Sequence, residues 1–200
     1  VMGWPNIPGK VQKLAARNVD QQMQEAVARH NGGDIAGAKL AYRKIAREFP
    51  MFAEADNMLA IVELQAGNKQ SALEHSMASV EKQPKEARYQ NTMATCLWMN
   101  GLAEDAIETL KRAIQLNPDM FEAYLNLGEI YEASQQPKLA FENFQQALRI
   151  KPNSPQVLVK LGRIHANHGS PAQASTLFRQ ALAINPGMES AKKGLAAVGG

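Results

Sequence analysis

Apolar residues recur along the chain with the spacing of amphipathic helices. In residues 121–154 a first run falls at i, i+3, i+4 and i+7: Tyr124, Leu127, Gly128 and Tyr131. A second run follows in the same window: Leu139, Ala140, Phe144, Ala147 and Leu148. No stretch alternates apolar and polar residues with the period of two that is typical of strands. The pattern therefore predicts an all-α chain.

Prolines divide the chain into segments of 34 residues. They stand at the same place in five successive segments: Pro50, Pro84, Pro118, Pro152 and Pro186. Counting each segment from 31 residues before its proline gives the starts Val19, Ala53, Ala87, Phe121 and Pro155. Self-similarity at a fixed period is typical of repeat architectures, in which each unit buries its apolar face against its neighbours.

Other positions of each segment are restricted in size or conformation. Position 20 is always alanine: Ala38, Ala72, Ala106, Ala140 and Ala174. Position 8 is always alanine or glycine: Ala26, Ala60, Ala94, Gly128 and Gly162. Small residues at both places allow two antiparallel helices to approach closely. Position 15 is glycine except at Gln135, and glycine there supplies a left-handed residue that closes the first helix. Ser170-Pro171-Ala172-Gln173 predicts a capping box at the start of a helix.

These marks resemble the tetratricopeptide repeat (TPR) family. Its W-x2-L-G-x2-Y…A-x3-F…A…P pattern is matched in residues 121–154 by Tyr124, Leu127, Gly128, Tyr131, Ala140, Phe144, Ala147 and Pro152. Residues 155–188 match nearly as well: Leu158, Leu161, Gly162, Ala174, Phe178, Ala181 and Pro186. The resemblance covers residues 19–188 as five repeats, 19–52, 53–86, 87–120, 121–154 and 155–188. It implies an α/α solenoid, a right-handed superhelix of stacked antiparallel helix hairpins.

The first two repeats depart from the family pattern. Polar residues stand there where apolar ones are usual: Gln22, Glu25, Arg29, Asp56, Glu63, Ser76 and Ser79. At the ends, residues 9–31 predict one long helix, or two joined near Asn18, so that residues 1–18 form a tail and a capping helix. Residues 189–200 are expected to form a C-terminal capping helix and tail, because open arrays need their terminal faces covered.

Composition indicates a folded chain in a reducing compartment. Apolar residues make up 45% and charged residues 20% of the chain, which is not the composition of a disordered protein. No eighteen apolar residues run together without charge, so we expect no membrane span. The N-terminus lacks the pattern of a signal peptide, and the single cysteine, Cys96, favours a cytoplasmic location. The Val-Met start and Gly-Gly end are typical of a fragment of a longer chain.

The charge pattern gives little reason to expect a nucleic-acid partner. The net charge is +3, with basic residues gathered toward both ends of the chain. Aromatic residues are not interleaved with these cations, as they are in proteins that bind single strands. We therefore expect no nucleic-acid binding and attribute the basic ends to solubility.

No set of residues predicts catalysis or a cofactor. Phosphate-binding loops, nucleophile elbows and metalloprotease motifs are absent from the sequence. His165 and His168 lie at i and i+3, but no carboxylate is close in sequence, so a metal site is not expected. Cys96 falls at an apolar helix position and is expected to be buried and inert. The chain is therefore predicted not to be an enzyme, and no cofactor is implied.

The resemblance assigns a concave groove to positions 2, 5, 6, 9, 12 and 13 of each first helix. Apolar residues occupy several of these positions in the first three repeats: Met23, Val27, Met58, Ile61, Leu64, Trp98 and Met99. Contiguous apolar surface of this kind marks a partner site, unless some of these side chains pack against a neighbouring repeat. Polar residues complete the predicted groove: Asn57, Asn91, Asn126, Lys160 and Arg163. The asparagines are expected to pair with the backbone of a bound peptide.

The sequence thus predicts a protein–protein interaction scaffold that holds a peptide or helix of its partner. The alternative is a module that presents substrate to the sulfotransferase, glycosyltransferase or methyltransferase domain of a larger bacterial enzyme. Self-association is a third interpretation. The carboxylate clamp of TPR co-chaperones is not expected, because Asn91, Thr95 and Gln156 do not match it. The asparagine ladder of O-linked GlcNAc transferases is also broken, since position 6 is asparagine only at Asn126.

Overall fold

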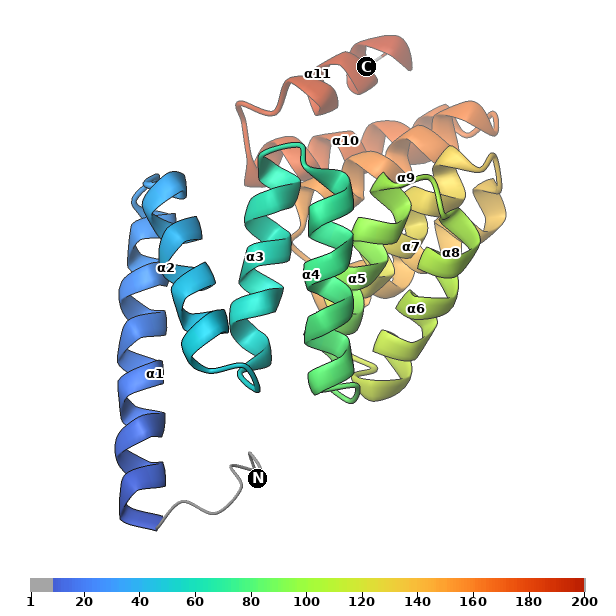
Figure 1. The fold of residues 1–200 in the computed structure, drawn as a ribbon. Coiled ribbons are helices and arrows are strands. Elements are labelled where there is room, and N and C mark those ends of the chain that lie inside the picture. Colours follow the sequence, from blue (N-terminus) through green and yellow to red (C-terminus); the bar gives the residue numbers. More distant parts are fainter. Residues whose placement is uncertain (1–8, 200) are drawn as a thin grey trace. The chain divides into compact units, whose positions relative to one another are not determined.

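The computed structural model describes residues 9–199, and the surroundings of side chains from residue 17 onward. The tail expected at residues 1–8 lies outside the described residues. The described chain forms eleven helices and no strand (Figure 1), which confirms the all-α prediction. The helices are α1 (Gly9–Asn31), α2 (Ile35–Glu48), α3 (Ala53–Gln65), α4 (Lys69–Lys82), α5 (Ala87–Met99), α6 (Ala103–Leu116), α7 (Phe121–Ala133), α8 (Pro137–Ile150), α9 (Pro155–Asn167), α10 (Pro171–Ile184) and α11 (Glu189–Ala197).

Proline sets the start of three of these helices. The first residues of α8, α9 and α10 are Pro137, Pro155 and Pro171. A backbone N–H at the first helical position makes no hydrogen bond within the helix, so proline, which lacks that N–H, loses none there. The side chain of Ser170 makes no hydrogen bond to α10, so the capping box predicted there is wrong. Because proline already fixes the first backbone torsion, α10 begins without that hydrogen bond.

The described contacts divide the chain into two compact units. Unit 1 is Val1–Ala106 and unit 2 is Ile107–Gly200, so the division falls inside α6. Unit 1 holds the hairpins α1–α2 and α3–α4 and the helix α5, and unit 2 holds α7–α8, α9–α10 and α11.

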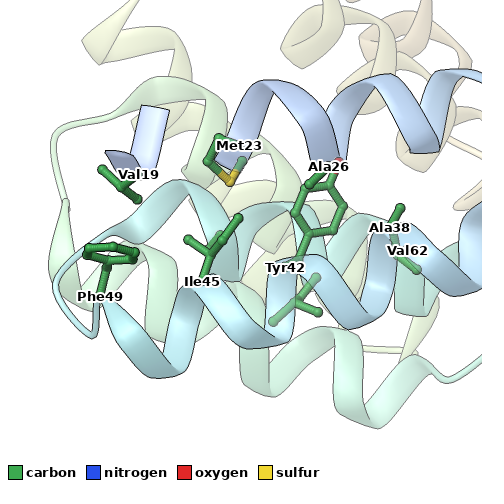
Figure 2. Packing of buried hydrophobic residues seen from close by; sticks show 10 residues of the cluster. Val19, Met23, Ala26, Ala38, Tyr42, Ile45, Phe49 and Val62 are labelled. Atoms are coloured by element: carbon green, nitrogen blue, oxygen red, sulfur yellow. The ribbon is translucent and has the colours of Figure 1, made fainter. Parts of the chain in front are cut away.

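The core of unit 1 begins between α1 and α2 and continues onto α3 (Figure 2). Ala26 of α1 and Ala38 of α2 are both fully buried, as the size restriction at positions 8 and 20 predicts. Beside them Tyr42 and Ile45 fill the hairpin, and Leu59 of α3 packs against the same cluster. Small residues therefore bring the helices together, and large residues fill the space next to them.

The hairpins of unit 2 use glycine for the same close approach. A Cβ atom on Gly128 of α7 would lie 2.4 Å from Cε1 of Phe144 on α8, and Gly162 faces Phe178 in the same way. At the C-terminal end, Ala191 and Leu195 of α11 join the cluster around Phe178. This helix covers apolar surface of α9 and α10, while Lys192 and Lys193 stay exposed.

The contact between Gly128 and Phe144 predicts a cost for one added methyl group. Gly128→Ala gains about 1 kcal/mol of helix propensity, but overpacking of the buried ring costs about 1–3 kcal/mol. We therefore expect a net loss of about 1 kcal/mol in the free energy of unfolding, measured by urea denaturation. Gly187→Ala is the matched control, because its Cβ would meet no heavy atom nearer than 3.5 Å. Equal stability of the two variants would contradict the close approach.

The turn after each first helix uses a left-handed residue. Gly33, Gly67, Gly101 and Gly169 have φ between 72° and 84°. Gln135 takes the same place after α7 and still has a positive φ of 55°. The repeat geometry therefore imposes the left-handed backbone on a residue whose Cβ disfavours it.

Relief of this strain makes Gln135→Gly a stabilising change. Removing the side chain from a left-handed position is expected to raise the free energy of unfolding by about 0.5–1 kcal/mol, as chemical denaturation would measure. The neighbouring Ser134→Gly is the matched control, because φ of Ser134 is −82° and glycine there only adds freedom to the unfolded chain. A loss of stability in Gln135→Gly would show that its side chain makes a contact worth more than the strain.

Candidate partner-binding surface

Four apolar side chains of the predicted groove lie on α3 and α5, which contact each other in unit 1. Ile61 and Leu64 are half-buried on α3, and Trp98 is half-buried on α5. Leu64 also packs in part against the buried cluster around Ala60 and Cys96. Met99, the last residue of α5, is 43% exposed. We name these four residues the α3–α5 surface. Its side chains are held by helices yet still present apolar area to solvent.

A polar contact joins α3 to α5 near their first turns. The hydroxyl of Tyr89 donates to Oε2 of Glu54 at 2.7 Å, and Nη2 of Arg88 lies 3.4 Å from the same oxygen. Since Glu54 and Arg88 occupy the same repeat position one repeat apart, the two first helices are tied at equivalent heights. This contact helps to fix the spacing of the α3–α5 surface.

Three other apolar residues of the predicted groove contribute to the core of unit 1. Met23 is only 6% exposed and belongs to the cluster between α1 and α2. Val27 and Met58 are half-buried and pack against that cluster. These side chains therefore follow the alternative considered from the sequence, in which a groove position packs against a neighbouring helix.

The predicted asparagines are largely occupied within the chain. Asn57 is 4% exposed, and its Oδ1 is buried without a hydrogen-bond partner in the structure. Asn91 and Asn126 are half-buried and each already takes part in an interaction. A bound backbone would therefore have to compete with contacts inside the protein to reach Asn91 or Asn126.

The predicted groove positions of unit 2 carry charges that neutralise one another. Nζ of Lys160 lies 2.8 Å from Oε2 of Glu132 and 3.2 Å from Oε1 of Glu129. Arg163 is 3.8 Å from the other oxygen of Glu132. Burial alone would lower the pKa of Lys160, but the hydrogen bond to Glu132 and the two carboxylate charges raise it above its ordinary value.

The sequence departure at Glu63 corresponds to a buried ion cluster. The Glu63 side chain is 1% exposed and accepts from Nζ of Lys39 at 2.8 Å, Nη2 of Arg43 at 3.1 Å and Nδ2 of Asn68 at 2.7 Å. Lys39 and Arg43 belong to α2, while Asn68 immediately precedes α4. The signal was present in the sequence as two cations, at positions 21 and 25, in the helix that precedes the acid. Glu63 therefore holds α2 and the start of α4 onto α3.

A second buried carboxylate, Asp56, lies in the α3–α4 hairpin. It pairs with Lys82, and Nδ1 of His75 is 3.8 Å from its Oδ1. Burial alone would raise the pKa of Asp56, but hydrogen bonds and charge from His75 and Lys82 hold it below its ordinary value. Burial likewise acts to raise the pKa of Glu63, and the hydrogen bonds from Lys39 and Asn68, with the nearby cations, lower it. Both carboxylates are therefore held ionised.

The remaining chemically reactive side chains considered from the sequence are those of Cys96 and His165. Cys96 is fully buried, and burial raises the pKa of its thiol although Ser76 opposes this with a hydrogen bond. Among the described residues no three His, Cys, Asp or Glu side chains gather as a metal site would require. His165 packs edge-to-face against Phe141, with ring centroids 5.4 Å apart. In the described part of the chain, none of the helices combines the length and apolarity needed to cross a membrane.

Sequence models of one family match most of the chain. The model described as TPR repeat matches residues 100–135, and two described as tetratricopeptide repeat match residues 23–87 and 119–186. The helix hairpins and their restricted positions agree with these matches. The chain is a tetratricopeptide repeat protein. A search of curated protein sequences finds no significant match to it.

Solved structures share the fold of this TPR protein. A MamA protein is 24% identical, with a TM-score of 0.68 over 86% of this chain and 93% of that one. A thermophilic TPR protein of Thermus thermophilus is 20% identical, with a TM-score of 0.74 over 90% of this chain and 98% of that one. The APC/C hetero-tetramer Cut9–Hcn1 is 20% identical, with a TM-score of 0.82 over 90% of this chain and 36% of that one. These likenesses establish an α-helical TPR solenoid.

The Glu63 cluster predicts a pH-dependent contribution to the stability of the TPR array. Because the folded pKa lies below the ordinary value of 4.5, the contribution is complete above pH 4.5 and is lost as the pH falls through the folded pKa. We expect Glu63→Gln to lower the free energy of unfolding by about 2 kcal/mol at pH 7, with a smaller difference at pH 3.5. Urea denaturation at several pH values measures both.

Glu81→Gln provides the matched control, since Glu81 is exposed on α4. It should change stability by less than about 0.5 kcal/mol at each pH. If Glu63→Gln proved as stable as the wild type at pH 7, the ion cluster would have no net stabilising role.

Proposed function

We propose that this TPR protein is an interaction scaffold that binds a peptide or helix of a partner protein on the α3–α5 surface. The observation that carries the proposal is the half-buried Trp98 beside the exposed Met99, with Ile61 and Leu64 on the adjacent helix. Tryptophan is enriched among residues that dominate binding energy, and methionine adapts to varied partners. Apolar residues gathered on neighbouring helices support a docking role.

The surroundings of the α3–α5 surface support low-cost binding. Helix α3 is tied to α2 and α4 through Glu63 and to α5 through Glu54, so the receptor has little to order when a partner arrives.

A solved structure of the same fold and the single cysteine give less specific support to this proposal. Cut9–Hcn1 is a hetero-tetramer, so a chain of this fold takes part in a protein assembly there. We extend that role, but not its partner, to this protein. The single cysteine is buried and in no disulfide, which suits the reducing cytoplasm as the proposed location.

The proposal predicts that charges placed on the α3–α5 surface prevent partner binding. The tagged wild type and a Trp98→Glu/Met99→Glu variant would be incubated with lysate of the source organism, and bound proteins quantified by mass spectrometry. We expect recovery of a specific partner to fall at least tenfold, because a buried anchor is lost and a carboxylate is desolvated. Met99→Glu alone should reduce recovery less.

Met51→Glu/Met77→Glu is the matched control, since these exposed methionines lie outside the α3–α5 surface and receive the same charges. It should recover the partner at the wild-type level, and circular dichroism should show equal helix content in the wild type and all three variants. Equal recovery by both double variants, or no specific partner of the wild type, would contradict the proposed function.

A further inference from the structure

A second apolar surface lies on α8, α9 and α10 of unit 2, away from the predicted groove positions. One open pocket of about 460 Å³ is lined by Phe141, Leu148, Leu161 and Leu177 among others. An adjacent pocket of about 280 Å³ shares Phe141 and His165 with the first and is also lined by Ile164. The two edge-to-face rings, with centroids 5.4 Å apart, therefore form a ridge between two apolar hollows.

The hollows are not a general property of stacked hairpins. In the 34-residue register Phe141 and His165 correspond to Lys39 and Glu63 of unit 1. There the pair forms a 2.8 Å ion contact reinforced by Arg43, whereas the residue equivalent to Arg43 in unit 2 is Gln145. An ion cluster therefore occupies this junction in unit 1, while unit 2 has two rings with open pockets beside them.

The charges around the two pockets are of one sign. Their linings include the cations Lys138 and Arg149 and no carboxylate. Residues 134–188 contain six lysines and arginines and a single acid, Glu142. Within the described part of the chain Lys138 and Arg149 form no ion pair, and Arg149 only donates to the Gln146 side chain at 3.2 Å. These two cations are therefore available to an acidic partner.

The spacing of the cations sets the size of that partner. Lys138 and Arg149 are eleven residues apart on α8, which corresponds to about 16 Å along the helix, or three turns. Arg149 lines the larger apolar pocket and Lys138 the smaller one. A partner helix of about the same length presents apolar side chains at i, i+3 or i+4, and i+7 on one face.

We propose that the α8–α10 face binds a short acidic amphipathic helix of a partner protein. Its apolar side chains enter the pockets on either side of the Phe141–His165 ridge, and its carboxylates, about three turns apart, meet Lys138 and Arg149. This surface is separate from the α3–α5 surface and works whether or not that surface binds a partner. Its selectivity comes from the absence of carboxylates from the linings of both pockets, which leaves a basic helix without a counter-charge there.

The test uses three rhodamine-labelled synthetic helical peptides of sixteen residues and fluorescence anisotropy with the whole chain. The first carries leucines at positions 4, 8 and 11 and glutamates at 1 and 12, which flank the leucine face, on a background of alanine and glutamine. The second replaces the glutamates with lysine, and the third replaces the leucines with alanine. We expect the first peptide to bind at least tenfold more tightly than either of the others at low salt.

Two charge-reversal variants locate the binding. Lys138→Glu/Arg149→Glu should weaken the first peptide about tenfold and strengthen the lysine peptide. Arg179→Glu/Lys193→Glu is the matched control, because both residues are exposed and line neither pocket, and it should retain wild-type binding. Photo-leucine in the first peptide should cross-link to residues 137–180, and Trp98→Glu/Met99→Glu should leave binding unchanged.

Other results would overturn the proposal. These are no binding of the first peptide, equal binding of all three, equal loss in both charge variants, or cross-links confined to residues 53–99. The last measurement is the oligomeric state of the chain without peptide, by sedimentation velocity. A dimer that Lys138→Glu/Arg149→Glu dissociates would assign the face to a second copy of this chain instead of a partner helix.

Discussion

The close approach of the two helices within each hairpin is the constraint on which the rest of the structure depends. The alanines at positions 8 and 20 are fully buried wherever they occur, and Gly128 and Gly162 take the same place against a phenylalanine ring. A fixed helix spacing leaves a volume at position 24 that Tyr42, Phe144 and Phe178 fill. In the second repeat that residue is Ser76, and the buried Cys96 of the next repeat packs into the cluster around Ala60 and Ala72. The constraint is thus on total volume, and a neighbouring repeat can supply part of it.

With the hairpins fixed internally, chemical variety is concentrated where one hairpin meets the next. The same pair of repeat positions holds Lys39 with Glu63, Leu73 with Leu97, and Phe141 with His165. An ionic, an aliphatic and an aromatic junction are not interchangeable. A hairpin bearing Glu63 against Leu73 or Phe141 would bury a carboxylate without a cation, at a cost of several kcal/mol. The junctions therefore favour one order of repeats as well as stabilising it.

The fold could be predicted further from the sequence than the binding surface could. Helix starts follow from Pro155 and Pro171, and the left-handed turn persists even at Gln135, because backbone geometry is imposed by the whole hairpin. The register identified Glu63 as unusual, but only the structure shows that Lys39, Arg43 and Asn68 surround it. Groove positions were harder to interpret. Met23 and Trp98 are both large side chains at predicted groove positions, yet one is core and the other half-buried, because burial depends on which helix packs alongside.

The distribution of charge determines what each surface can contribute to affinity. On unit 2 a partner's carboxylate would meet Lys160 already held by Glu129 and Glu132, so it would have to displace existing ion contacts and lose its own hydration. The α3–α5 surface requires no such exchange of ion contacts, because covering its apolar side chains releases only water. Burying that apolar area contributes about 25 cal/mol of binding free energy for each Å². Charged positions then act mainly on orientation and on the rejection of wrong partners. Affinity is therefore expected to follow apolar area, and selectivity to follow the cations that have no carboxylate of their own.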